Sequence, residues 1–161
     1  MGQSSTSEVQ QVTDWVVADI RRRYERVIVS GASTWPPESN LAPLLAICED
    51  AGIQCFGVRN TDHLKACLVD PVGTGWMLVY QCEATVHQQF AYVLHELAEF
   101  IMRSMDASSD YPAIDGCVHD LRHIVAQRVV KALLPTPPVG VLVGQHGFVY
   151  RCPENVLVAP E

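Results

Sequence analysis

The chain has 161 residues, of which 48% are hydrophobic and 18% charged, a balance that suits one globular domain and excludes a disordered chain. Its formal net charge of -7 argues against nucleic-acid binding, because nucleic-acid-binding proteins gather positive charge. Residues 1–11 lack the apolar core of a signal peptide, and no apolar run is long enough to span a membrane, so we expect a cytoplasmic protein that contacts no membrane.

The first helix is predicted over residues 9–27, where apolar residues such as Val16 and Ile20 recur at helical spacing. The Ser-rich residues 1–8 before it are expected to be flexible. The basic cluster Arg21–Arg23 lies on this helix, and we interpret it as a solvated face, not as a phosphate-binding site.

A short second helix is predicted after residue 40, with Ser39 or Asn40 as its N-cap and Gly52 just past its C-terminus. Gly52 suits this place because glycine readily adopts the left-handed backbone conformation that ends many helices.

Three strands are predicted next, over residues 53–58, 64–70 and 75–81. The proline and glycines of segment 70–75 favour a hairpin between the second and third strands. We expect the three strands to form a small antiparallel sheet.

Two longer helices are predicted over Val86–Met105, with Thr85 as N-cap, and over Val118–Leu134, which ends at Pro135. Residues 136–161 are predicted to form a C-terminal hairpin and tail. The whole chain is therefore predicted to be a single α+β domain whose small sheet packs on the helices.

Six cysteines are spread along the chain without a C-x-x-C pair. Without an export signal we expect reduced thiols that pack as small hydrophobic side chains. Cys117 alone lies near the histidines described below, and a single cysteine is more often a packed thiol than a metal ligand.

The motif richest in chemistry is His95-Glu96-Leu97-Ala98-Glu99. His95 and Glu99 are four residues apart, so a helix projects both from one face, with Glu96 beside them. Two ligands one turn apart, with a glutamate between them as general base, are typical of zincin metallopeptidases, although those have histidine where Glu99 stands. On its own this pentapeptide is more often a solvated face of a helix.

The following helix offers a third ligand, because His119 and His123 are again four residues apart. Catalytic zinc is usually held by three protein side chains, and either histidine would complete the set. Such a pair more often lies at a surface or an interface, but its occurrence together with the first motif favours a metal site. The sequence leaves open which histidine is the ligand.

Both segments are similar to signatures of the ImmA/IrrE metallopeptidases. Residues 90–99 (FAYVLHELAE) resemble the family's rFtlaHElgH, and residues 123–135 (HIVAQRVVKALLP) resemble its ExEAnxFAaeLLmP. The predicted order of elements over residues 41–135 also follows that family. The resemblance therefore implies a zincin-like fold for residues 41–135.

The resemblance also implies a zinc ion, which the family binds through two histidines and one glutamate. Glu99 stands where the family has its second histidine, and His123 stands where it has its glutamate. We therefore predict that His95, Glu99 and His123 bind Zn²⁺, with the ligand types exchanged, and that Glu96 is the general base.

Neighbouring side chains are predicted to assist this site. His119 would support an oxyanion or replace His123 as ligand, and Asp120 would orient a ligating imidazole through its second nitrogen. Tyr92 is a further candidate for oxyanion support.

The resemblance implies an intracellular metallopeptidase, linked to stress or mobile elements, that cleaves a regulatory protein such as a DNA-binding repressor. The alternative is a catalytically inactive module of the same fold that binds or regulates a partner, which the unusual Glu99 favours. A third interpretation is a metal-free interaction domain whose histidines line a surface.

Overall fold

The computed structural model describes residues 2–27, 41–59, 64–70, 73, 75–105 and 118–134. The elements found there are α1 (Gly2–Val27), α2 (Ala42–Asp50), β1 (Ile53–Val58), β2 (Ala66–Val69), β3 (Trp76–Gln81), α3 (Val86–Met105) and α4 (Val118–Leu133). The predicted α+β class is confirmed for this part of the chain.

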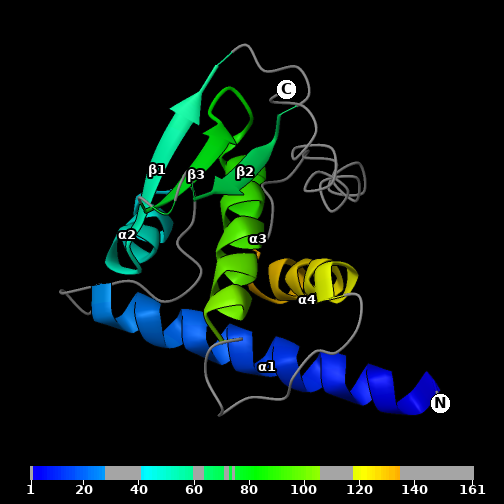
Figure 1. Ribbon diagram of the computed structural model, residues 1–161. Helices are drawn as coiled ribbons and strands as arrows, with labels where there is room; N and C mark the ends of the chain where they lie inside the picture. The colour runs from blue at the N-terminus through cyan, green and yellow to red at the C-terminus, as the bar shows by residue number, and fades with distance from the viewer. Residues whose placement is uncertain are drawn as a thin grey trace.

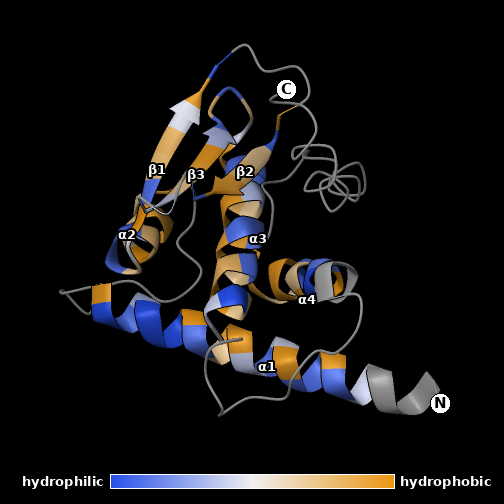
Figure 2. Ribbon diagram, viewed as in Figure 1, coloured by the Kyte–Doolittle hydropathy of each residue, from blue (hydrophilic) through white to orange (hydrophobic). Residues whose placement is uncertain are grey.

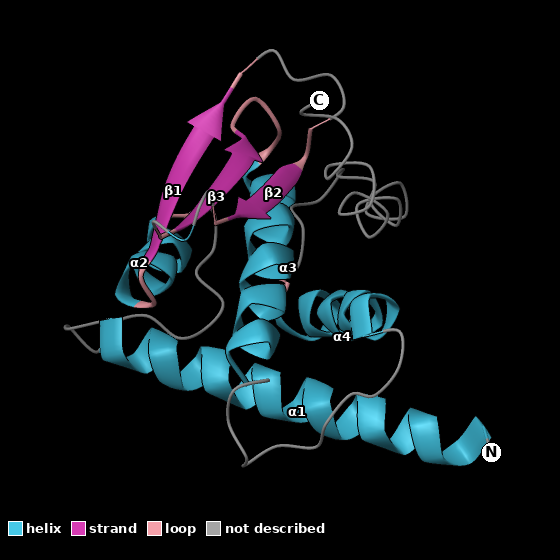
Figure 3. Ribbon diagram, viewed as in Figure 1, coloured by secondary structure: helices cyan, strands magenta, loops and turns pink. Residues whose placement is uncertain are grey.

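Helix α3 is the centre of the arrangement, because it contacts the sheet and all three other helices (Figure 1). Helices α2 and α3 pack against the strands, whereas α1 and α4 pack mainly on other helices (Figure 3). Any side chain on α3 is therefore shielded on several sides, which places the H-E-x-x-E motif in the interior.

The sheet is mixed, so the prediction of an antiparallel sheet is wrong in part. The strand order is β1-β3-β2. The β2–β3 hairpin is antiparallel as predicted, with Leu68 opposite Leu78, but β1 runs parallel to β3, with Cys55 opposite Leu78. Alternating hydrophobicity fixes which face of a short strand is buried, but it does not fix which strand becomes its neighbour. Here β3 takes the middle place and buries Leu78 and Tyr80.

Helix α1 begins at Gly2, whereas the helix was predicted from residue 9 and residues 1–8 were expected to be flexible. The segment after Gly2 contains no proline, and extending an existing helix adds one hydrogen bond for each residue fixed. The apolar stripe of α1 is as predicted, since Val16 and Ile20 are fully buried. Helix α1 packs on α4. In addition, Arg128 of α4 donates a hydrogen bond to Gln10 of α1 over 3.2 Å.

Of the two predicted ends of α2, the C-terminal one is confirmed and the N-cap is wrong. Its N-cap is Leu41, which makes no side-chain cap hydrogen bond, and not Ser39 or Asn40. Pro43 in the first turn removes one of the amide donors that a cap would otherwise satisfy. At the other end, Gly52 has a φ of 87° and its amide donates to the carbonyl of Glu49, which confirms its predicted place.

The start of α3 is fixed by a capping box. The amide of Gln88 donates to Thr85 Oγ1 over 3.2 Å, and the amide of Thr85 donates to Gln88 Oε1 over 3.0 Å. Each side chain satisfies a backbone donor that the first turn leaves unpaired. The predicted N-cap Thr85 is therefore confirmed for the helix that carries the histidine motif.

One main hydrophobic core joins the helices to the sheet (Figure 2). Its fully buried side chains come from several elements and include Val12, Ile20, Leu44, Ile53, Leu78, Leu97 and Val129. Because α1 contributes to the same core as the sheet and the other helices, α1 is an integral part of the domain.

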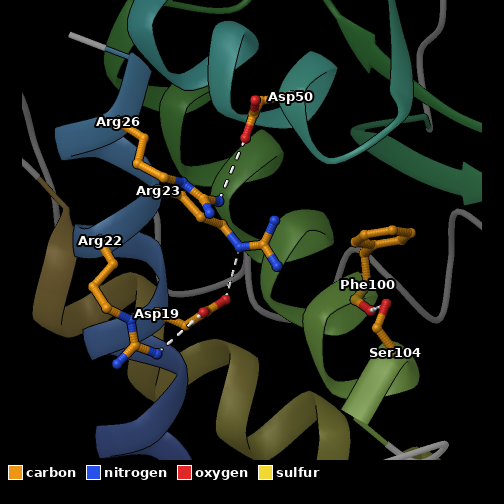
Figure 4. A network of polar contacts seen from close by, with 7 residues as sticks. All are labelled: Asp19, Arg22, Arg23, Arg26, Asp50, Phe100 and Ser104. Carbon is orange, nitrogen blue, oxygen red and sulfur yellow. Dashed lines mark hydrogen bonds and ion pairs between the residues drawn. The ribbon is translucent and has the colours of Figure 1, made fainter.

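Three arginines of α1, namely Arg22, Arg23 and Arg26, contact carboxylates (Figure 4). Asp19 accepts contacts from Arg22 at 3.2 Å and Arg23 at 2.7 Å, and Arg26 lies 3.4 Å from Asp50 of α2. The Arg26–Asp50 pair is exposed, and such a pair contributes at most about 1 kcal/mol. The interpretation as a solvated face fits these contacts.

The predicted C-terminal hairpin and tail, residues 136–161, lie outside the described residues. Within the described residues, no helix combines the length and the apolarity that crossing a membrane requires.

Candidate metal centre

The candidate centre lies where α3 packs against α4. The four-residue spacing of His95 and Glu99 puts both on the face of α3 that meets α4, and His123 projects from α4 toward them. Val125, Ala126 and Val129 of α4 are fully buried, and their packing fixes the rotation that turns His123 inward.

The three side chains converge on one point. One ligand atom from each of His95, Glu99 and His123 lies within 4.8 Å of the other two, and all three residues are buried. Glu99 Oε2 lies 3.7 Å from His95 Nε2, and Glu99 Oε1 lies 3.4 Å from His123 Nδ1. The two imidazole rings are 5.7 Å apart between centroids and tilted by 32°.

These separations suit metal ligands better than hydrogen-bonded pairs. Nitrogen and oxygen ligands about 2.0–2.1 Å from a tetrahedral zinc lie roughly 3.3 Å from one another. The observed contacts of 3.4 and 3.7 Å, each to a different oxygen of Glu99, are close to that edge length, whereas N–H···O hydrogen bonds span about 2.7–3.2 Å. The described cluster could therefore hold a metal ion.

Hydrogen bonding within the described structure leaves polar atoms of this cluster unsatisfied. Both imidazole nitrogens of His95 and Oε1 of Glu99 are buried without a hydrogen-bond partner there. An unsatisfied buried polar group costs about 1–3 kcal/mol. A cation at the point where the ligand atoms converge would satisfy one ring nitrogen of His95 and the carboxylate of Glu99, so the donor set fits a divalent metal.

Burial keeps the imidazole of His95 in its neutral form, which is the form that binds a metal ion. Burial, and then the neighbouring His123, lower the pKa of His95 to about 3, so its ring is neutral near pH 7. Its contact with Glu99 is consequently not an ion pair. Burial raises the pKa of Glu99 to about 7, against the opposing effect of Arg103 and Arg122. A bound divalent cation would favour the ionised carboxylate.

Glu96 lies beside the cluster and is also buried. Burial, followed by the negative charge of Glu99, raises the pKa of Glu96 well above its ordinary value, and Arg103 opposes this shift. The carboxyl group of Glu96, outside the ligand cluster, therefore interacts with that of Glu99, within the cluster. Glu96 can hold a proton at a pH where an exposed glutamate would have lost it.

Three further residues were predicted to assist the site: His119, Asp120 and Tyr92. His119 and Asp120 belong to the first turn of α4, one turn before His123, but their side chains lie outside the described residues. Tyr92 is buried in the hydrophobic core and does not belong to the ligand cluster. Among the described side chains, the cluster that could hold a metal consists of His95, Glu99 and His123.

Sequence reasoning missed the positive side chains near the centre. Arg103 and Arg122 both lower the pKa of Glu99, and the guanidinium of Arg103 lies 5.9 Å from the ring centroid of Trp76. The spacing of Glu99 and Arg103, four residues on one helix, was a signal for this neighbour. His87, near the start of the same helix, is also buried.

Comparison of this chain with models of protein families, with curated proteins and with solved structures finds no match.

Proposed function

We propose that this protein is a zinc-dependent metallopeptidase of the ImmA/IrrE type that cleaves a regulatory protein, such as a DNA-binding repressor. The observation that supports it is the convergence of His95, Glu99 and His123 at ligand distances, with Glu96 beside them. The ImmA/IrrE family, which the sequence resembles, binds zinc through two histidines and one glutamate. The proposed ligand set has the same number of imidazole and carboxylate donors and the same charge. The zincin-like fold is part of this proposal.

In the proposed reaction, zinc would act as a Lewis acid and make a water molecule acidic near neutral pH. Glu96 accepts the proton of the attacking water and then delivers it to the amine that leaves. A group serves best in this role when its pKa lies near the working pH, and the raised pKa of Glu96 moves it in that direction. His95, Glu99 and His123 would hold the ion, and the neutral ring of His95 would need to lose no proton before it bound the metal.

The burial of the centre favours a second candidate function. Side-chain exposure is only 2% for His95, 6% for Glu99 and 7% for His123, so a peptide bond would need covering groups to move before it reached them. A metal that only ties α3 to α4 needs no such access. The second candidate is therefore a catalytically inactive module that uses the same site to support its fold while it binds a partner.

The Glu96→Gln variant separates the two candidates. The zinc-loaded protein is incubated with a mixture of unstructured peptides, and new amino termini are identified by mass spectrometry. The peptidase proposal expects new termini with the wild type and none with Glu96→Gln, while both proteins bind zinc equally. Glu83→Gln, which changes an exposed carboxylate just before α3, is the matched control and should cleave like the wild type.

Either of two results would refute the peptidase: wild-type protein that binds zinc but produces no new termini, or Glu96→Gln protein that cleaves as fast as the wild type. The first result would favour the inactive module.

A further inference from the structure

An arginine beside the metal centre has no ion-pair or hydrogen-bond partner among the residues that the structure describes. Arg103 follows Glu99 by four residues on α3, so both project from the same face of the helix. The Nε of Arg103 is buried without a hydrogen-bond partner, and no described carboxylate forms an ion pair with its guanidinium. Because a guanidinium carries five N–H donors, Arg103 keeps its full capacity to bind an anion.

Two aromatic rings restrain the Arg103 side chain. Trp76 at the start of β3 packs edge-on against Phe100 of α3, with ring centroids 5.8 Å apart and an interplanar angle of 78°. The guanidinium carbon of Arg103 lies 5.9 Å from the centroid of the same Trp76 ring, within the range of a cation–π contact. A guanidinium that is already held in place loses less entropy when it binds an anion.

Arg22 of α1 makes a similar ring contact, but its charge is matched. Its guanidinium also lies 5.9 Å from a tryptophan ring, that of Trp15, and it contacts the carboxylate of Asp19 at 3.2 Å. The Arg22 side chain is 61% exposed, whereas Arg103 is only partly exposed. Since Arg103 is more shielded from water and lacks a carboxylate, an incoming carboxylate would gain more there than at Arg22.

We propose that Arg103 binds a carboxylate of the substrate, so that the centre prefers peptides with an acidic group near the bond to be cleaved. The inference rests on the proposed peptidase and names the substrate class of the same site. The carboxylates of Glu96 and Glu99 would balance the charge of a divalent ion, which leaves the positive charge of Arg103 for a substrate group. The carboxylate is that of an Asp or Glu side chain or of the peptide C-terminus.

Peptide binding tests this preference without requiring cleavage. The zinc-loaded Glu96→Gln protein is titrated against short fluorescein-labelled peptides in which one glutamate is moved along an otherwise neutral sequence, and against matched peptides with glutamine instead. Fluorescence anisotropy measures each dissociation constant. We expect glutamate to tighten binding about tenfold at one position. Neutral peptides with a free or an amidated C-terminus show whether the terminal carboxylate gives the same gain.

Variants made in the same Glu96→Gln protein assign the preference to Arg103. Arg103→Gln should bind the acidic and neutral peptides equally. Arg103→Lys keeps the charge but lacks the planar fork that binds both carboxylate oxygens, so it should keep a smaller preference. Arg22→Gln is the matched control and should discriminate like the Glu96→Gln protein. Zinc content and thermal unfolding show that each variant keeps its metal and its fold.

Either of two results would overturn the proposal: a Glu96→Gln protein that gains no affinity from glutamate at any position or from a free C-terminus, or an acidic preference that persists in Arg103→Gln. Cleavage of a peptide mixture by the wild type tests the proposed function separately. New termini without an acidic preference would support the peptidase and reject the role of Arg103. A preference in binding that depends on Arg103, without any cleavage, would reject the peptidase alone.

Discussion

Glu99 Oε1 lies 3.4 Å from His123 Nδ1, so a carboxylate of α3 meets an imidazole of α4 across the packed helix pair. The second oxygen of the same carboxylate lies 3.7 Å from His95 Nε2. Glu99 therefore lies between the two imidazoles. Two imidazoles and one carboxylate from the two helices thus surround one point.

Glu99 should make the metal-free protein less stable as the pH rises. Burial raises the folded-state pKa of Glu99 to about 7 from an ordinary value near 4.5, so the folded state binds more protons than the unfolded state between these values. Stability contributed by the protonated carboxyl is therefore lost as the pH increases through this window. The metal-free Glu99→Gln variant, which cannot ionise, should gain stability over the wild type from about pH 4.5 to about pH 7.

Thermal unfolding of both proteins in a chelator, measured across this pH range, shows whether the wild type loses stability relative to Glu99→Gln as the pH rises. Excess zinc should reverse the order at pH 7, because the wild type gains binding energy that Glu99→Gln lacks. If the metal-free wild type instead became steadily more stable than Glu99→Gln as the pH rose, this would contradict the raised pKa of Glu99.

Alanine variants of His119 and His123 show which of the two histidines is the third metal ligand. Loss of a group that only orients a ligand lowers metal affinity by about 10–100-fold, so loss of the ligand itself should cost more. We expect His123→Ala to bind zinc more than about 100-fold more weakly than the wild type, and His119→Ala to lose less. Competition with a chromophoric zinc chelator measures both affinities. Equal losses in the two variants, or a larger loss in His119→Ala, would move the ligand assignment to His119.

The capping box at the start of α3 should contribute measurably to stability. Replacing Thr85 with alanine removes the acceptor for the amide of Gln88 and should lower the free energy of unfolding by about 1 kcal/mol. Urea denaturation followed by circular dichroism measures this difference. Thr85→Ser keeps the hydroxyl and should remain close to the wild type; a loss as large as that of Thr85→Ala would show that the cap hydrogen bond is not responsible.

Helix α1 should unfold together with the rest of the domain. Ile20 is fully buried in the shared core, so Ile20→Ala should cost about 2–5 kcal/mol through lost burial and the cavity that remains. Ile124 on α4 is 40% exposed, and Ile124→Ala should change stability by no more than about 0.5 kcal/mol. A single transition, shifted to lower urea in Ile20→Ala, is expected. Two separate transitions would show that α1 folds independently.

Local signals in the sequence predicted several elements well. The range Val86–Met105 and its cap Thr85 follow from helical periodicity and from a capping residue, both of which act within a few residues. Strand β1 is likewise found at its predicted range, residues 53–58. The parallel pairing of β1 with β3 could not be predicted, because short alternating strands specify a buried face without specifying a neighbour.

For the candidate centre, helical spacing predicted that His95 and Glu99 share a face. Their meeting with His123 depends on how α4 is rotated against α3, which is set by long-range packing, and the resemblance supplied that expectation. The buried state of Glu96 and its interaction with Arg103 are tertiary effects that follow from the same packing. Zinc binding and the role of Glu96 as a base stay predictions.

The most direct test of the central claim is the zinc content of the purified protein, measured by elemental analysis after loading with excess zinc and dialysis. His95→Ala serves as the metal-free reference, and His87→Ala, which removes another buried histidine of the same helix, serves as the matched control. We predict one zinc per chain in the wild type and in His87→Ala, and none in His95→Ala. Wild-type protein that stays free of zinc, or His95→Ala protein that holds as much as the wild type, would contradict the account.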